Sequence, residues 1–178
     1  MASACTIETE RLLIRPLCEE DLEAFHRLQS DPQVTQFTKQ GPNKDITKSQ
    51  EILDDCLVEM NASDSAELVL ILAIIVKPVV ASSGLVGLVG TFRPREIGFS
   101  LHPTSWGRGL AREAVDAFAR WFKSSFPDEQ LFAKVSAENR ASVKVCQGCG
   151  FTKATDQEVR SDLRLQVDSI RETWLCRL

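Results

Sequence analysis

The feature that most constrains the fold of this 178-residue chain is a glycine-spaced loop joined directly to an amphipathic helix. The loop reads Trp106-Gly107-Arg108-Gly109. Apolar residues then recur at helical spacing, at Ala111, Ala114, Val115, Phe118 and Phe122. Residues 97–102, just before the loop, alternate apolar with small or polar side chains as a strand does, and Pro103 ends the alternation. The sequence therefore predicts a strand, a tight loop and a helix of about four turns.

This loop is suited to bind an anion. The first N–H groups of a helix have no acceptor within the helix, and the positive end of the helix dipole attracts negative charge. Gly107 and Gly109 would let the backbone approach a pyrophosphate without a Cβ in the way. The spacing matches neither a P-loop nor the three glycines of the dinucleotide fingerprint. An ordinary strand-to-helix turn has the same local pattern, so the loop alone does not establish a site.

A second pattern follows downstream. Residues 131–135 have the character of a short strand, and Asn139-Arg140-Ala141-Ser142 and Gly150-Phe151 follow it. The order of strand, glycine loop, helix, strand, Asn-x-x-Ser helix and Gly-Phe resembles the acetyl-CoA-binding half of the GNAT superfamily of N-acetyltransferases. Residues 10–17 with Glu20-Asp21 resemble the opening of the branch that includes the ribosomal-protein N-terminal acetyltransferases. The resemblance extends over residues 7–151.

The resemblance implies a single α/β (α+β) domain over residues 1–178. Its central sheet would be mixed, mostly antiparallel, with about six to seven strands flanked by about four helices. The periodicity predicts strands over 7–15, 68–76, 85–92, 95–102, 131–135 and 169–176. Turns at 81–84 and 93–94 make residues 68–102 an antiparallel meander.

Two further helices are expected before the meander. One spans 19–29, and the other follows Thr47-x-x-Gln50, which has the pattern of a capping box. The polar linker over 31–45 separates them, and the resemblance implies that it lines the pocket of the acetyl acceptor.

The chemistry implied by the resemblance is attack of a neutral amine on the thioester carbonyl of acetyl-CoA. Backbone N–H groups from Arg108 to Arg112 would bind the pyrophosphate, and an N–H near Leu101 or His102 would polarise the carbonyl. Asn139 would lie against the pantetheine arm and Ser142 near the sulfur. The expected cofactor-binding residues are Leu101, His102, Trp106, Gly107, Arg108, Gly109, Leu110, Ala111, Arg112, Asn139 and Ser142.

The chain contains no tyrosine, the residue that acts as the acid in many members of the superfamily. Ser142 is the candidate proton donor, because its spacing from Asn139 places both on one helix face. The alternative for Ser142 is a hydroxyl bonded back to the preceding helical turn.

Two residues are candidates for the base. Glu96 and His102 share a strand face because they are six positions apart and residues two apart lie on the same face. Glu96 lies at the strand end away from the loop, whereas His102 lies beside the cofactor. The resemblance favours Glu96. The alternatives are an exposed strand-end charge for Glu96, a hydrogen-bonded turn residue for His102, and a neutral amine that needs no strong base.

Two positions depart from the superfamily pattern. Trp106 stands where many members carry Gln or Arg, a variant that the ribosomal-protein-like branch often shows. Gly148 stands where the second helix commonly carries a basic residue. One expected charge on the cofactor side is therefore missing, and the last turn of that helix is weakened.

Composition and segment patterns argue against several other classes. The net charge of −4, without any basic run, argues against a nucleic-acid partner. The longest apolar run, 68–76, is far shorter than the roughly twenty residues that a membrane span requires. No segment resembles an export signal, so a cytoplasmic location is expected.

Six dispersed cysteines are expected to be reduced and mostly buried. The Cys146-x-x-Cys149 spacing also occurs in redox and zinc sites, but it falls inside a predicted helix and only two histidines accompany it. We therefore expect core packing and no metal.

Three functions remain open. The first is an enzyme that moves an acetyl group from acetyl-CoA to a primary amine, either a protein N-terminus or a small molecule, by direct attack in a ternary complex. The second is a non-catalytic acyl-CoA-binding or regulatory module, and the third is an interaction domain without a cofactor. CoA binding separates the third from the others, and thioester turnover separates the first two. The sequence determines neither the acceptor nor the oligomeric state.

Overall fold

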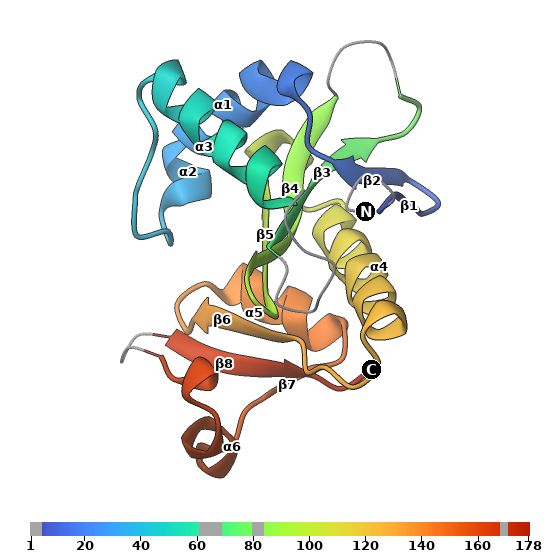
Figure 1. Cartoon of the computed structure of the whole chain (residues 1–178), viewed down its shortest axis with the longest axis vertical. Helices are drawn as coiled ribbons and strands as arrows, with labels where there is room; N and C mark the ends of the chain where they lie inside the picture. Colours follow the sequence, from blue (N-terminus) through green and yellow to red (C-terminus); the bar gives the residue numbers. More distant parts are fainter. Residues whose placement is uncertain (1–4, 61–68, 80–83, 168–170) are drawn as a thin grey trace.

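An eight-stranded sheet runs through the molecule in the order β1-β2-β3-β4-β5-β6-β8-β7 (Figure 1). The computed structural model describes residues 5–60, 69–79, 84–167 and 171–178. The strands are β1 (Ile7–Glu8), β2 (Leu12–Pro16), β3 (Leu70–Val76), β4 (Leu85–Arg93), β5 (Glu96–Leu101), β6 (Phe132–Ser136), β7 (Phe151–Lys153) and β8 (Arg171–Cys176). The α-helices are α1 (Leu22–Ser30), α2 (Pro32–Thr35), α3 (Ile46–Met60), α4 (Leu110–Ser125), α5 (Arg140–Gly148) and α6 (Asp156–Ser161). The predicted mixed, mostly antiparallel α/β architecture is confirmed.

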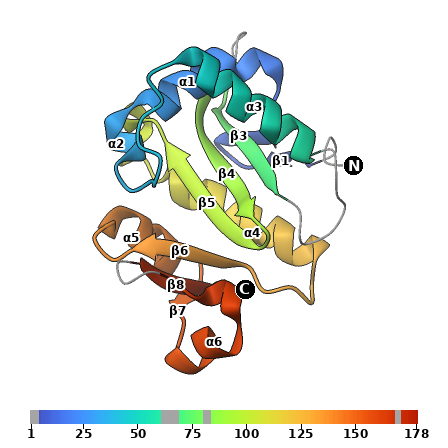
Figure 2. The same ribbon diagram turned by 60° about the vertical axis from the view of Figure 1, so that its left-hand side comes forward.

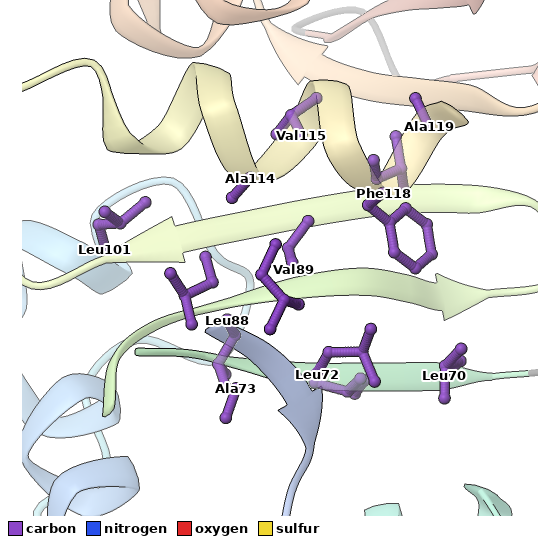
Figure 3. Packing of buried hydrophobic residues seen from close by; sticks show 14 of the residues in the cluster. Leu70, Leu72, Ala73, Leu88, Val89, Leu101, Ala114, Val115, Phe118 and Ala119 are labelled. Atoms are coloured by element: carbon purple, nitrogen blue, oxygen red, sulfur yellow. The ribbon is translucent and has the colours of Figure 1, made fainter. Parts of the chain in front are cut away.

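The apolar run of β3 forms the middle of the core. All its residues but the last are buried, because helices cover both faces of the sheet there. Helices α1 and α3 lie on one face of β3 and β4, and α4 lies on the other (Figure 2). Figure 3 shows Val115 and Phe118 of α4 above Val89 of β4. The antiparallel pairings of β3 with β4 and of β4 with β5 confirm the predicted meander.

The N-terminal segment differs from the single strand predicted over 7–15. It forms a hairpin in which Ile7 of β1 pairs with Ile14 of β2. Two hydrogen bonds reverse the chain: the Thr9 N–H donates to the Leu12 carbonyl, and the Leu12 N–H donates to the Thr9 hydroxyl at 2.9 Å. A side chain that closes its own turn competes with continuation of the strand.

The predicted capping box at Thr47 and Gln50 is wrong. Helix α3 already begins at Ile46, and the Thr47 N–H donates to the Asp45 carboxylate at 2.9 Å. The Gln50 amide instead bonds Asp54 at 2.7 Å. Asp45 is as good a cap as threonine, and its position two residues before Thr47 decides the start of the helix.

Short elements explain why the structure has more strands and helices than predicted. The N-terminal hairpin adds one strand and β7 adds another after Gly150. Helix α2 falls in the expected linker, and α6 in the charged stretch after β7. Most of the predicted turn at 81–84 and the start of the predicted strands at 68 and 169 lie outside the described residues.

The strands β5 and β6 diverge, and this divergence opens the sheet. Their only register position within the described chain is Glu96 with Phe132, a parallel pairing at the start of both strands. The Phe132 N–H donates to the Arg95 carbonyl at 3.0 Å at the same end. Toward the end of β5, the edge facing β6 is therefore left without a partner strand (Figure 2).

Within the described ranges, no helix has the length and apolar character required to cross a membrane.

Candidate active site

A cavity of about 770 Å³ opens where β5 leaves β6. Its walls come from α2 and the residues after it, the end of β5, the glycine loop, and the first turns of α4 and α5. All the predicted cofactor-binding residues except His102 and Arg108 line it. The structure thus brings together two motifs that lie far apart in the sequence.

The N-terminus of α4 offers unpaired donors to this cavity. Gly109 is its N-cap with a φ of 76°, a conformation that favours glycine, and it supplies no capping side chain. The first helical bond runs from the Glu113 N–H to the Gly109 carbonyl, at 3.1 Å. The N–H groups of Leu110, Ala111 and Arg112 therefore precede the helical ladder and are available to an anion.

The glycine loop is held from outside by the N-terminal hairpin. Arg11 donates to the Arg108 carbonyl at 2.8 Å and to the Glu113 carboxylate at 2.6 Å. Thr9 also donates to Glu113. Partial burial by itself would raise the pKa of Glu113, but the hydrogen bonds from Thr9 and Arg11 outweigh it and lower that pKa. Glu113 therefore stays ionised at neutral pH and keeps Arg11 against the loop.

We expect Arg11→Gln to weaken CoA binding by about tenfold, because the Arg108 carbonyl loses a charged anchor. Calorimetric titration with CoA measures the effect. Arg120→Gln is the matched control, since Arg120 lies on α4, the helix that carries Glu113, in an exposed ion pair with Asp116. Equal affinities for the Arg11→Gln and Arg120→Gln variants would show that the hairpin does not position the loop.

The backbone at the end of β5 presents one donor toward the opening. The His102 N–H donates to the Val86 carbonyl of the neighbouring segment at 2.8 Å, so it is already in use. Hydrogen-bonded and non-hydrogen-bonded pairs alternate in an antiparallel ladder. Leu101 pairs with Gly87, and the bond from His102 to Val86 flanks this pair, so Leu101 and Gly87 form a non-hydrogen-bonded pair. The Leu101 N–H and carbonyl consequently point away from β4. The Trp106 indole N–H donates to the Leu101 carbonyl at 2.6 Å. The Leu101 N–H stays open.

The start of α5 forms the opposite wall. Asn139 is the N-cap, and its side-chain oxygen accepts the Ser142 N–H at 3.1 Å. This bond is made by the Ser142 backbone and caps the start of the helix. Both residues line the cavity, with the Asn139 amide nitrogen and the Ser142 hydroxyl outside that bond.

Positive side chains line the cavity at the starts of two helices. Arg112, Arg140 and Lys144 line the cavity together with the acidic Glu138. Arg112 and Arg140 lie in the first turns of α4 and α5, where the helix dipole disfavours a cation. A bound phosphate would offset that cost.

The two candidate bases lie outside the cavity lining. The Glu96 side chain is only 12% exposed, and its carboxylate lies 3.2 Å from Arg93 Nη1 and 3.5 Å from Lys134 Nζ. It therefore bridges β5 and β6 at their joined end. The His102 ring lies between Thr104, at 2.9 Å, and Asp31, at 3.9 Å. The expectation that Glu96 takes the proton from the acceptor is not supported by this position.

Both cysteines of the Cys146-x-x-Cys149 pair are buried in the hydrophobic core, Cys146 within α5 and Cys149 as its C-cap residue. Burial raises the pKa of Cys146 to about 12 and that of Cys149 to about 11, because a buried thiolate lacks hydration. All six cysteines are free thiols. Thiols of this kind belong to packing rather than to nucleophilic chemistry.

Sequence reasoning missed the helix in the linker over 31–45, which was expected to line the acceptor pocket. Gln33, Val34, Gln36 and Phe37 line the cavity from α2 and the residues just after it. Asp31 caps this helix by accepting the Gln33 N–H at 2.7 Å, and Pro32 is its first residue. An Asp-Pro pair is a helix-start signal that would have revealed it.

Known proteins match both the sequence and the fold. A family model described as an acetyltransferase (GNAT) domain matches residues 11–152. The uncharacterized N-acetyltransferase p20 of Bacillus licheniformis is 27% identical over 148 residues, 83% of either chain. An acetyltransferase structure from Agrobacterium tumefaciens superposes with a TM-score of 0.76 at 24% identity, covering 99% of this chain and 96% of that one.

The structure of a ribosomal-protein-serine acetyltransferase, so named provisionally, from Vibrio cholerae superposes with a TM-score of 0.69 at 15% identity over 87% of each chain. This likeness is one of fold. The span of the family model contains the glycine loop, the Asn139 cap and the closing Gly-Phe. The chain therefore belongs to the GNAT family of acetyltransferases.

Proposed function

We propose that this protein transfers the acetyl group of acetyl-CoA to a primary amine, in a ternary complex held by the cavity. The observation that carries this proposal is one cavity with three parts. Its lining includes the first turn of α4 with its unpaired N–H groups, Leu101 at the end of β5, and residues of α2. These parts correspond to a pyrophosphate, a thioester carbonyl and an acceptor.

On the donor side, the N–H groups of α4 and the cations near them would bind the phosphates of CoA. The pantetheine arm would then run along the open edge of β5, where an extended chain finds backbone groups without a partner strand. Asn139 has an amide nitrogen free of its cap bond to bind that arm.

On the acceptor side, the wall combines two glutamines with aromatic rings. Gln33 and Gln36 supply amide groups, and Phe37 and Phe99 supply apolar surface. Amides can bond the peptide groups that follow a protein N-terminus, as well as the polar groups of a small amine. The acceptor is therefore a primary amine of either kind.

In the reaction, the amine nitrogen attacks the thioester carbonyl and forms the new C–N bond. The Leu101 N–H stabilises the oxyanion, and the C–S bond then breaks. The Ser142 hydroxyl donates its proton to the departing thiolate and regains one from solvent. The proton of the amine leaves to water, because the cavity selects a neutral amine and orients it.

The absence of tyrosine favours one alternative, a non-catalytic acyl-CoA-binding module. Two measurements on the purified protein decide between them. We expect CoA to bind in calorimetric titration, and acetyl-CoA with a panel of N-terminal peptides and small amines to release free thiol. Binding without thiol release from any amine would establish the module, and absence of CoA binding would exclude both functions.

Glu96→Gln is expected to keep turnover within about twofold of wild type and to leave the pH–rate profile unchanged. The reason is that Glu96 faces Arg93 and Lys134 rather than the cavity. A steady-state pH profile with saturating acetyl-CoA measures this. A lost ionisation, in a variant with wild-type CoA affinity and melting temperature, would return the role of base to Glu96.

A further inference from the structure

We propose that the acceptor is a primary amine with an apolar group beside it and no second positive charge, and that Phe37 contacts this apolar group. This inference rests on the proposed function and deepens it, because it narrows the class of amine that the cavity accepts. A peptide whose first residue is apolar has this chemistry, and so does a small apolar amine.

The first observation is the charge of the cavity wall. Among the described residues that line the cavity, Glu138 is the one carboxylate, and the residues from α2 and just after it are all uncharged. The other charged lining residues are cations, namely Arg112, Arg140 and Lys144. A second ammonium group on the acceptor would therefore meet no carboxylate on the α2 wall, and burying a charge without a partner is costly.

The acidic residue at the start of α2 is already engaged. One oxygen of the Asp31 carboxylate accepts the Gln33 N–H at 2.7 Å and caps the helix. The other oxygen lies 3.9 Å from Nε2 of His102, and Asp31 does not line the cavity. This carboxylate therefore stabilises α2 and the end of β5 rather than a cationic acceptor.

The second observation is the exposure of Phe37. Its side chain lines the cavity and is 40% exposed, whereas Val34 and Phe99, which line the same cavity, are partly buried against the core. A single exposed hydrophobic residue is ordinary on an outer surface. In a cavity wall, however, a ligand can cover the ring, and removing that apolar area from water favours a ligand with an apolar group.

The third observation is that the backbone around Phe37 is held in place. The Thr38 N–H and the Thr38 hydroxyl both donate to the Thr35 carbonyl at 2.8 Å, which closes a turn around Phe37. Thr35 is buried, and its hydroxyl donates to the Asp31 carbonyl at 2.9 Å. A ring on a fixed turn loses less conformational entropy on binding than a ring on a free loop, so it is suited to select an acceptor.

The test compares acceptors by thiol release at saturating acetyl-CoA. Three peptides differ only in their first residue, which is phenylalanine, glycine or arginine, and the small amines are phenethylamine, ethylamine and spermine. Arginine adds a positive charge without a second primary amine. We expect kcat/KM for the phenylalanine peptide or for phenethylamine to exceed the values for the arginine peptide and spermine at least about tenfold. The better of the two apolar acceptors shows whether the source is a peptide or a small molecule.

Phe37→Ser is expected to lower kcat/KM for the better apolar acceptor about tenfold, chiefly through KM. The value for its glycine or ethylamine counterpart should change less than about twofold, because neither offers a group to the ring. Phe37→Leu should keep most of the preference, since it keeps an apolar side chain. Val58→Ser is the matched control, because Val58 is exposed on α3 and outside the cavity lining. The Kd for CoA and the melting temperature should match wild type in all three variants.

Turnover of the arginine peptide or spermine as fast as that of the apolar acceptors would overturn the proposal and leave the proposed function in place. Equal losses on the apolar acceptor and its counterpart, or weaker CoA binding by Phe37→Ser, would overturn the role of Phe37. Absence of thiol release from every amine would overturn the proposed function and this inference together.

Discussion

Gly109→Val is expected to keep its fold and to bind CoA at least about 100-fold more weakly than wild type, a loss of about 2.7 kcal/mol. Gly109 has a φ of 76°, and a β-branched residue in that conformation costs about 1–3 kcal/mol. Inside the protein a Cβ there meets only Arg11 Nη2, at 3.5 Å. The valine methyl groups would therefore take the place of the bound anion. The substitution would also disturb the N–H groups that the peptide orients.

Calorimetry with CoA and thermal melting measure the two effects separately. Gly41→Val is the matched control, since Gly41 also has a positive φ, 66°, with no atom within 4 Å of a built Cβ. It should lose similar stability and no CoA affinity. If a folded Gly109→Val protein binds CoA as wild type does, the helix N-terminus is not the pyrophosphate site.

Ser142→Ala is expected to lower kcat by about 100-fold, the range for removal of a general acid. CoA affinity should change little, because the capping bond to Asn139 uses the Ser142 backbone N–H and survives the substitution. Single-turnover measurement of thiol release, under conditions where chemistry limits the rate, checks the effect.

Ser142→Cys is the matched control, because it keeps a proton donor of similar size at the same place. It should retain most of the turnover that alanine loses. Equal rates for wild type and Ser142→Ala would assign the hydroxyl to the helix surface and favour proton transfer from water.

Patterns that repeat within one element were predicted well. The stripe of α4 buries Ala114, Val115, Phe118 and Phe122 as its spacing requires. The apolar run of β3 could only be a covered strand. Element starts were harder, because neighbouring polar residues compete for the same orphan N–H groups. Asp45 instead of Thr47 decided the start of α3.

The sequence by itself determined the local chemistry of this protein: a glycine loop at a helix N-terminus, an Asn-x-x-Ser cap and the family to which both point. Only the tertiary structure decided what these parts face. The sheet register leaves the Leu101 N–H open while using that of His102. Packing between distant segments places Glu96 beside Lys134 and Arg112 against Gly148. Short-range periodicity cannot encode such contacts, because strand pairing and helix packing join residues far apart in the chain.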